Sequence, residues 1–306
     1  GDKDRLDVPL EQDLRCGEDC GELFPFGFGP GEMPDDQTDD NARGLSFVTD
    51  DIRDDTILVG APKLTVRLSC DRPKGQIIAR LSDLRPDGTA MLISHGFLNL
   101  RHRGGNDRKV DLVPGEVFGA EIILDQCAYH LPAGHKLCLS LSSSYWPFCW
   151  PEGDAFSVHL SDGHIMLPLC AASAKEMHFA PPPPVEKRDT KALSETQESK
   201  TWHTLKDGTR VLTIIGDRGR VEDIASGVIT DAWMKEVWSI HPDRPESARS
   251  ESTWTRGFGR GTWRAHSKVS MTMQCRHDSF EISQRLETWD GEDAVFDQSW
   301  TASVPR

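Results

Sequence analysis

Apolar and polar residues alternate one by one along much of the first half of the chain, which is the pattern of half-buried β-strands. Between Pro62 and Cys70 every second residue is apolar, and charged or hydroxyl-bearing residues occupy the positions between. Similar runs recur at short intervals, separated by Gly, Pro and Asp residues that favour turns. We therefore expect an all-β fold, an antiparallel jelly-roll β-sandwich over residues 23–172, with strands near 45–48, 56–59, 62–70, 76–84, 89–103, 115–124, 134–142, 156–160 and 164–167.

Two turn signals add detail to this pattern. Pro86-Asp87-Gly88 follows the fourth run and predicts a hairpin, because Pro presets φ and Asp-Gly tolerates left-handed backbone geometry. Gly96, inside the next run, predicts a bulge or bend. Ser161-Asp162-Gly163 predicts a tight turn that pairs the last two runs with each other.

The flanking segments have different patterns. Residues 1–22 are acidic and lack periodicity, so we expect an extended lead-in. Residues 173–200 contain a run of four prolines followed by charged residues, which predicts a linker or a surface arm. Residues 201–306 alternate again and predict a second, smaller antiparallel β-meander packed on the sandwich, in which Trp254, Trp263, Trp289 and Trp300 fill one face or bind the first domain.

Composition narrows the range of partners. Asp and Glu total 49 against 35 Lys and Arg, so the net charge is -14 and nucleic acid is not expected as a partner. No apolar run approaches the roughly 20 residues of a membrane span. The eight cysteines are scattered and no secretory signal is present, which predicts reduced thiols and a cytoplasmic location. The chain opens on Gly1 rather than Met, and we expect it to begin partway into a larger protein.

Two aromatic stretches are candidate contact sites. Phe24, Phe26 and Phe28 alternate with Pro and Gly, so they form a loop that either plugs the domain's own core or is an apolar lip that docks on another domain. Trp146 and Trp150 lie in a second ring-rich segment that begins at Tyr145 and contains two prolines. Its rings could stack on sugars, but packing in the core or at an interface is favoured.

The chemistry of an enzyme is missing from the sequence. A serine nucleophile elbow of the form G-x-S-x-G does not occur. Cys16 and Cys20 form the only close cysteine pair, and without a second pair they do not make a zinc set. His159 and His164 flank a turn, where solvent-exposed histidines are favoured over metal ligands. We predict no catalytic residue, no metal and no cofactor.

Several motifs in order resemble the C-terminal domain of X-Pro dipeptidyl-peptidases and of cocaine-esterase-like acyl esterases. The resemblance covers roughly residues 23–170 and is weaker over 200–306. The residues that carry it are Ala79-Arg-Leu-Ser-Asp-Leu-Arg-Pro-Asp-Gly88, Ile93-Ser-His-Gly-Phe-Leu-Asn-Leu-Arg-His-Arg103, Val113-Pro-Gly-Glu-Val117, Pro132-Ala-Gly-His-Lys-Leu137 and Ser142-Ser-Ser-Tyr-Trp-Pro147.

The resemblance implies a galactose-binding-like jelly roll that accompanies an α/β-hydrolase domain with a serine triad. No position here matches that triad. The chain is therefore expected to be a non-catalytic module that packs on the catalytic domain of the same protein or operon, shapes its cleft and supports assembly, including a homo-oligomer. Phe24, Phe26 and Phe28 are the first candidates for docking, with Trp146 and Trp150 second. The alternatives are a free-standing carbohydrate- or ligand-binding module, or an enzyme in its own right.

Overall fold

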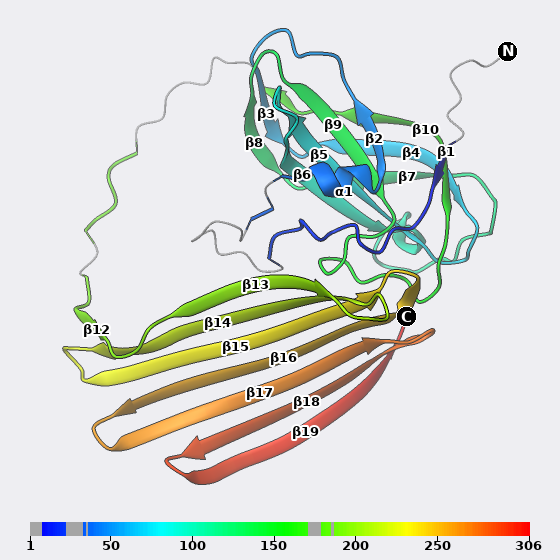
Figure 1. Ribbon diagram of the computed structural model, residues 1–306. Coiled ribbons are helices and arrows are strands. Elements are labelled where there is room, and N and C mark those ends of the chain that lie inside the picture. The colour runs from blue at the N-terminus through cyan, green and yellow to red at the C-terminus, as the bar shows by residue number, and fades with distance from the viewer. Residues whose placement is uncertain (1–7, 23–32, 35, 171–178, 185–186) are drawn as a thin grey trace, which may run out of the picture. The chain divides into compact units, whose positions relative to one another are not determined.

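The computed structural model of the protein describes residues 8–22, 33–34, 36–170, 179–184 and 187–306 (Figure 1). The chain divides into two compact units, Gly1–Glu176 and Met177–Arg306. Nearly every regular element among the described residues is a β-strand, so the expected all-β class is confirmed. The helical elements are α1 (Thr38–Ala42) and a single 3-10 turn, Leu100–His102.

The first unit contains three antiparallel sheets. Sheet A has the order β1 (Val8–Leu10), β10 (Val158–Met166), β4 (Lys63–Cys70) and β7 (Phe118–Ile123). Sheet B has the order β2 (Leu45–Val48), β9 (Lys136–Ser142), β5 (Gln76–Leu84) and β6 (Ala90–Asn99). Sheet C has the order β11 (Leu169–Cys170), β3 (Thr56–Gly60) and β8 (Cys127–Leu131).

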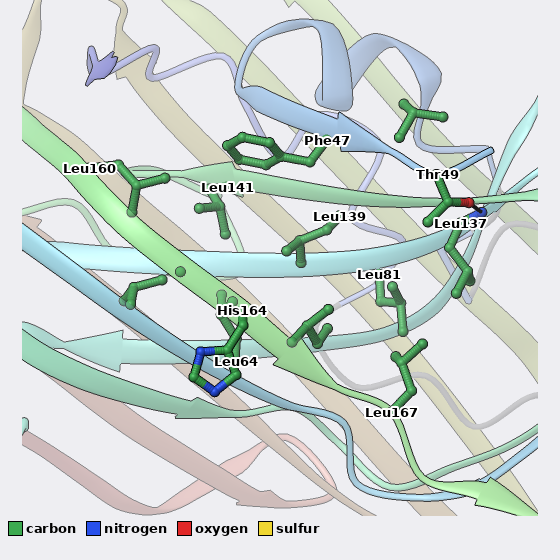
Figure 2. Close-up of a pocket in the computed structure, with 14 residues that line it drawn as sticks. Phe47, Thr49, Leu64, Leu81, Leu137, Leu139, Leu141, Leu160, His164 and Leu167 are labelled. Atoms are coloured by element: carbon green, nitrogen blue, oxygen red, sulfur yellow. Dashed lines mark hydrogen bonds between the residues drawn. The ribbon is translucent and has the colours of Figure 1, made fainter. Parts of the chain in front are cut away.

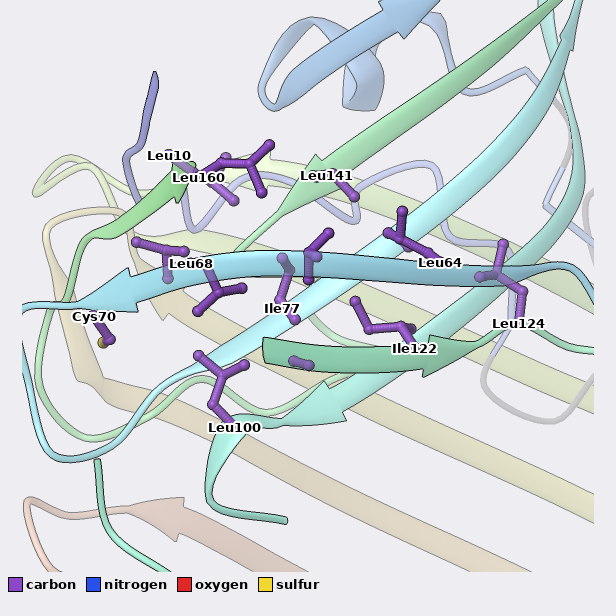
Figure 3. Packing of buried hydrophobic residues seen from close by; sticks show 14 of the residues in the cluster. Leu10, Leu64, Leu68, Cys70, Ile77, Leu100, Ile122, Leu124, Leu141 and Leu160 are labelled. Atoms are coloured by element: carbon purple, nitrogen blue, oxygen red, sulfur yellow. The ribbon is translucent and has the colours of Figure 1, made fainter. Parts of the chain in front are cut away.

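The core of the first unit lies between sheets A and B, because alternating side chains from both sheets point into it. Leu64 and Leu68 on β4 are at most 2% exposed and belong to the same buried cluster as Ile77 on β5 and Leu141 on β9. Figure 3 shows side chains from these strands meeting in one layer, with Ile122 of β7 beside them. The alternation predicted for β4 is therefore confirmed, with its apolar positions buried.

The predicted hairpin is present between β5 and β6. Gly88 has φ of +92°, which explains the requirement for glycine, and the Asp87 carboxylate accepts hydrogen bonds from the backbone and hydroxyl of Thr89. The expected bulge at Gly96 is wrong, because the register shifts opposite Leu81 and Ser82 and leaves Ile93 as the extra residue. β6 ends earlier than predicted, and the 3-10 turn follows it.

Gly96 has a packing role instead. A Cβ atom at this position would lie 2.8 Å from the carbonyl oxygen of Ile123 and 3.1 Å from Cα of Leu124. These atoms belong to the backbone at the end of β7 and cannot move aside as a side-chain tip could. The glycine therefore allows β6 to approach the end of β7 closely.

The turn predicted at Ser161-Asp162-Gly163 is absent. β10 is a single strand that pairs with β4 on both sides of this tripeptide, and a bulge between Leu160 and Asp162 absorbs the extra residue. These three residues favour a turn, but β4 is long enough to pair with β10 on both sides of them, so the strand continues. Three strands of the first unit were not predicted: β8, β11, and β1, which lies in the expected lead-in and extends sheet A.

The second unit is one antiparallel sheet whose strands lie side by side in Figure 1. It begins within the predicted linker 173–200, because β12 and β13 both pair with β14. Their polar sequences carried little alternation, which is why they were missed. The strands are β12 (Thr190–Ala192), β13 (Gln197–Thr204), β14 (Arg210–Asp223), β15 (Val228–His241), β16 (Arg244–Arg260), β17 (Trp263–Cys275), β18 (Ser279–Asp290) and β19 (Asp293–Pro305).

The four tryptophans singled out in the sequence of this sheet do not share one face, contrary to the first of the two expectations for them. The register places Trp254, Trp263 and Trp300 on the same side of the sheet. Trp289 pairs with His266 on the opposite side, and the two rings stack with centroids 4.5 Å apart. Successive residues of a strand point to opposite sides of the sheet. The side on which each tryptophan lies therefore follows from the register of its strand and not from its spacing in the sequence.

Replacing Gly96 with Ala is expected to lower the free energy of unfolding by about 1–3 kcal/mol, because the new methyl group must displace backbone of β7. Gly119→Ala is the matched control, since nothing lies within 4 Å of a Cβ there. Urea denaturation of both variants measures the difference. Equal midpoints for the two variants would contradict the assigned close contact.

Candidate functional site

Strand β5 is buried on both of its faces, which is unusual for a strand of a two-layer sandwich. Its first eight residues are all buried. Ile77 and Leu81 point into the core between the sheets, whereas Ile78 packs on the other face with Cys16 and Tyr145. The segment around Cys16 and the loop that begins at Tyr145 therefore cover the outer face of sheet B.

Arg80 is the charged centre beneath this cover and is 0% exposed. Its guanidinium donates hydrogen bonds to the Ser142 hydroxyl at 2.9 Å and to the Asp40 backbone carbonyl at 2.9 Å. It also lies 3.3 Å from the Asn41 side-chain oxygen and 4.9 Å from the centre of the Tyr145 ring. A buried cation is tolerated only when its donors are satisfied, so this arginine joins β5, β9, α1 and the covering loop.

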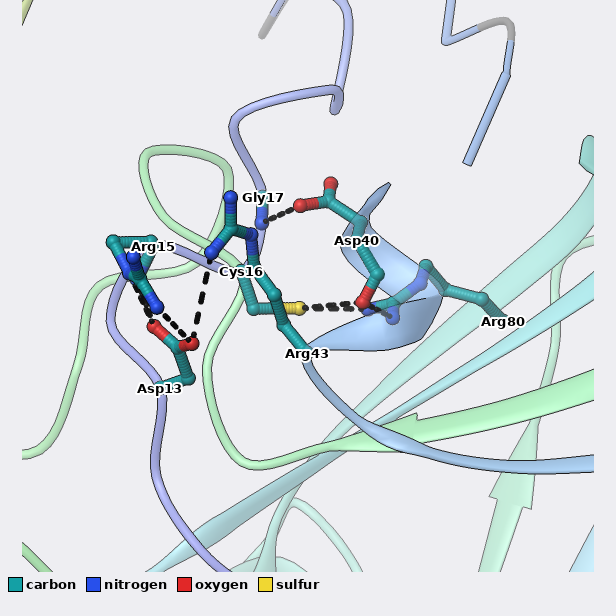
Figure 4. Close-up of polar contacts among 7 residues, drawn as sticks. All are labelled: Asp13, Arg15, Cys16, Gly17, Asp40, Arg43 and Arg80. Carbon is teal, nitrogen blue, oxygen red and sulfur yellow. Dashed lines mark hydrogen bonds and ion pairs between the residues drawn. The ribbon is translucent and has the colours of Figure 1, made fainter. Parts of the chain in front are cut away.

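Asp40 brings the opposite charge to the same region. Its carboxylate does not bond to the arginine but accepts a hydrogen bond from the backbone N–H of Gly17 at 2.8 Å (Figure 4). It accepts a second from the backbone N–H of Asp19 at 3.2 Å. Burial raises the pKa of Asp40 to about 6, although these hydrogen bonds and nearby Arg80 oppose the shift. The carboxylate thus fixes the N-terminal segment onto α1.

A second series of hydrogen bonds joins the loop that begins at Tyr145 to the N-terminal segment. The Tyr145 hydroxyl donates to the side-chain oxygen of Gln37 at 2.7 Å, and the Gln37 amide donates to the backbone carbonyl of Asp19 at 2.8 Å. Burial raises the pKa of Tyr145. The sequence signal for this centre is one arginine that follows the apolar residues Ile77-Ile78-Ala79.

The two aromatic segments proposed as contact sites differ in what the structure describes of them. Tyr145 and Trp146 are each 1% exposed, so neither can present a ring face to a sugar. Trp146 packs edge-to-face on the half-buried Trp150, with ring centroids 4.9 Å apart. The packing role favoured for this segment therefore applies to Tyr145 and Trp146. Phe24, Phe26 and Phe28 lie outside the described residues.

An Asp–His–Tyr cluster lies at the end of β5. Asp83 is 1% exposed, its carboxylate lies 2.8 Å from Nδ1 of His135, and it accepts a hydrogen bond from the Tyr129 hydroxyl at 2.8 Å. Burial, followed by the hydrogen bond to Asp83, raises the pKa of Tyr129. Among the described residues, no hydrogen bond joins His135 to a serine or cysteine, so this pair does not activate a nucleophile there.

The thiols do not form a reactive centre in the described part of the chain. Burial raises the pKa of Cys16 to about 11 and of Cys149 to about 12, whereas reactive cysteines have lowered values. Within the same residues no group of three or more His, Cys, Asp or Glu side chains could hold a metal ion. His159 and His164 lie on the single strand β10 and are both solvent-exposed.

The family is identified by its sequence pattern. A family model described as the X-Pro dipeptidyl-peptidase C-terminal non-catalytic domain matches residues 29–210. Because the match spans more than half of the 306 residues, the chain belongs to this family. The match runs from the segment before α1 through the sandwich to the first residue of β14. None of the curated proteins matches the chain.

Parts of several solved hydrolases are similar to this chain. An α-amino acid ester hydrolase matches with 15% identity and a TM-score of 0.48, covering 54% of this chain and 33% of its own. An aminopeptidase from a marine sediment Thaumarchaeota archaeon matches with 14% identity and a TM-score of 0.48, covering 55% and 34%. A CocE/NonD family hydrolase from Staphylococcus aureus has 14% identity and a TM-score of 0.37, covering 55% and 37%. The chain spans about a third of the length of these proteins.

The helices of the described residues are too short to cross a bilayer.

Replacing Arg80 with Met is expected to destabilise the protein by about 3–5 kcal/mol, because the buried acceptors around the guanidinium lose their donors. Arg67→Met is the matched control: Arg67 is exposed on β4, and its loss should change the free energy of unfolding by less than about 0.5 kcal/mol. Guanidinium denaturation measures both. A loss at Arg80 no larger than at Arg67 would show that the buried centre contributes nothing to stability.

The Asp40→Asn variant is expected to change how stability depends on pH. Because the pKa of Asp40 is raised from 3.8 to about 6 on folding, the folded state holds more protons between these values. The wild-type free energy of unfolding therefore falls as the pH rises through this window, by on the order of 3 kcal/mol relative to Asp40→Asn. Urea denaturation between pH 4 and 7 measures the divergence.

Asp39→Asn is the control for this measurement, because Asp39 is the exposed neighbour on the same helix. Its stability curve should run parallel to that of the wild type. If the Asp40→Asn curve also runs parallel, the assigned pKa of Asp40 is wrong.

Proposed function

We propose that this chain is the non-catalytic C-terminal module of a serine hydrolase of the acyl esterase or X-Pro dipeptidyl-peptidase type. The observation that carries the proposal is the family match over residues 29–210. The module packs on an α/β-hydrolase catalytic domain, shapes one side of its cleft and supports assembly. The catalytic serine, aspartate and histidine then belong to that partner domain, encoded in the same protein or operon.

The docking surface is proposed at the aromatic segment of Phe24, Phe26 and Phe28. Three rings spaced by Pro and Gly supply apolar area on a backbone that cannot form a helix. Trp150 is the second candidate because it is half-buried and keeps part of its ring accessible, while the buried Trp146 packs against it. Aromatic anchors of this kind dominate the energy of many protein interfaces.

We also propose that the module works in a reducing compartment such as the cytoplasm. The eight cysteines all lie in the described part of the chain, where they form no disulfide, and five of them are buried. Cys16 and Cys20 belong to the same buried cluster. A chain of this size whose cysteines form no disulfide is typical of proteins that fold in reducing conditions.

The proposal is tested by mixing the purified chain with the hydrolase part encoded upstream of it. Wild type is expected to bind with a Kd in the micromolar range or below and to raise the hydrolase's ester turnover. Changing Phe24, Phe26 and Phe28 together to Ser should weaken binding at least tenfold. The matched control replaces Phe179, Phe258 and Phe296, which are 80%, 50% and 40% exposed, with Ser and should bind as wild type does.

A fluorophosphonate probe separates the module role from the enzyme alternative. The probe should label the hydrolase part and leave this chain unlabelled. Covalent labelling of a serine in this chain, or the absence of any binding between the two parts, would contradict the proposed function.

A further inference from the structure

An apolar cavity of about 280 Å³ lies between sheets A and B in the first unit. It is bordered by the end of β2, the inner faces of β4, β5 and β9, and the second half of β10 (Figure 2). Twelve of its fourteen lining residues are apolar or glycine, and the other two are Thr49 and His164. None of the lining residues is Lys, Arg, Asp or Glu.

The cavity arises from a specific irregularity of β10. The bulge after Leu160 shifts the strand so that Gly163 pairs with Val66 and Ile165 pairs with Leu64. Directly paired residues face the same side of a sheet, so Gly163 lies on the same side as buried Val66 and lines the cavity at a point where β10 is exposed. A glycine there leaves a gap in a layer that is otherwise filled by Leu, Ile and Val side chains.

Water is a poor occupant of this space. A buried water needs two to four polar partners. The Thr49 hydroxyl already donates to the backbone carbonyl of Asp50 at 2.8 Å and accepts from the N–H of Leu137 at 3.0 Å. His164, the other polar residue of the lining, is exposed. An empty apolar void is also unfavourable, because its cost grows with its volume.

We propose that this cavity is a binding site for an uncharged alkyl or acyl chain of medium length. An engineered apolar cavity of about 150 Å³ already binds benzene, and ligand pockets begin near 300 Å³. The lining follows β9 from Leu137 to Leu141, a length of about 13 Å at the rise of a β-strand. The elongated form favours a chain over a compact ring, and the lack of a lining cation favours an alcohol or ester over a free carboxylate.

The site is independent of the proposed docking role, because its lining residues come from the inner faces and ends of the sandwich strands. Among its lining residues, the sequence singled out Gly163 as part of a turn and His164 as an exposed histidine, and neither as part of a binding site. Its formation depends on the bulge, which places Gly163 on the same side as Val66 although the sequence around it predicts a turn.

The test uses 1-octanol and the full chain. Isothermal titration calorimetry is expected to show saturable binding at one site, with a negative heat-capacity change because apolar surface is buried. Gly163→Leu fills the gap and should weaken octanol binding at least tenfold. Gly119→Leu is the matched control, because Gly119 is exposed on β7 and a side chain there meets nothing within 4 Å, so its affinity should equal that of wild type.

The proposal would be overturned if wild type showed no saturable octanol binding, or if Gly163→Leu bound octanol as tightly as wild type does. It would also be overturned if wild type bound 1,8-octanediol as tightly as 1-octanol, because the second hydroxyl of the diol has no partner in the cavity. Circular dichroism checks that each variant folds. If Gly163→Leu does not fold, Ile165→Trp enlarges another half-buried lining residue and must give the same tenfold loss.

Discussion

The structure of the first unit depends on the burial of one positive charge. Arg80 lies in the middle of β5 with no exposed surface, and an unsatisfied guanidinium there would cost more than the strand's apolar contacts could offset. Its donors are met by oxygens from α1 and β9, and its flat face is met by the Tyr145 ring. The N-terminal segment and the loop after β9 must therefore be in place before the outer face of sheet B is complete.

The two faces of β5 consequently serve different purposes. On the inner side, Leu81 contributes to the aliphatic core and to the apolar cavity beneath β10. On the outer side, the hydrogen bonds of Arg80 lie beside an apolar cluster that includes Ile78 and Tyr145. A strand that is held from both sides resists fraying, which suits a module whose proposed role is to support a neighbouring domain rather than to carry out chemistry.

The family match and the architecture divide the chain differently. The match ends at residue 210, at the start of β14, whereas the second unit continues through six long strands to residue 306. The matched region contains the sandwich strands from β2 to β11, and β12 and β13, which both pair with β14. The rest of that sheet lies outside the matched region and has an aromatic face that includes Trp254 and Trp300.

Much of the strand pattern could be predicted from the sequence, because alternation reports which residues face a core, and the hairpin at Pro86-Asp87-Gly88 followed from turn chemistry alone. Ordered motifs also identified the family. Tertiary contacts alone decided the rest: that Ser161-Asp162-Gly163 continues a strand, that Trp146 is buried, and that Arg80 is a buried centre. Local sequence records the preferences of a few neighbouring residues, whereas burial, bulges and the satisfaction of a buried charge depend on segments far apart in the chain that meet only after it has folded.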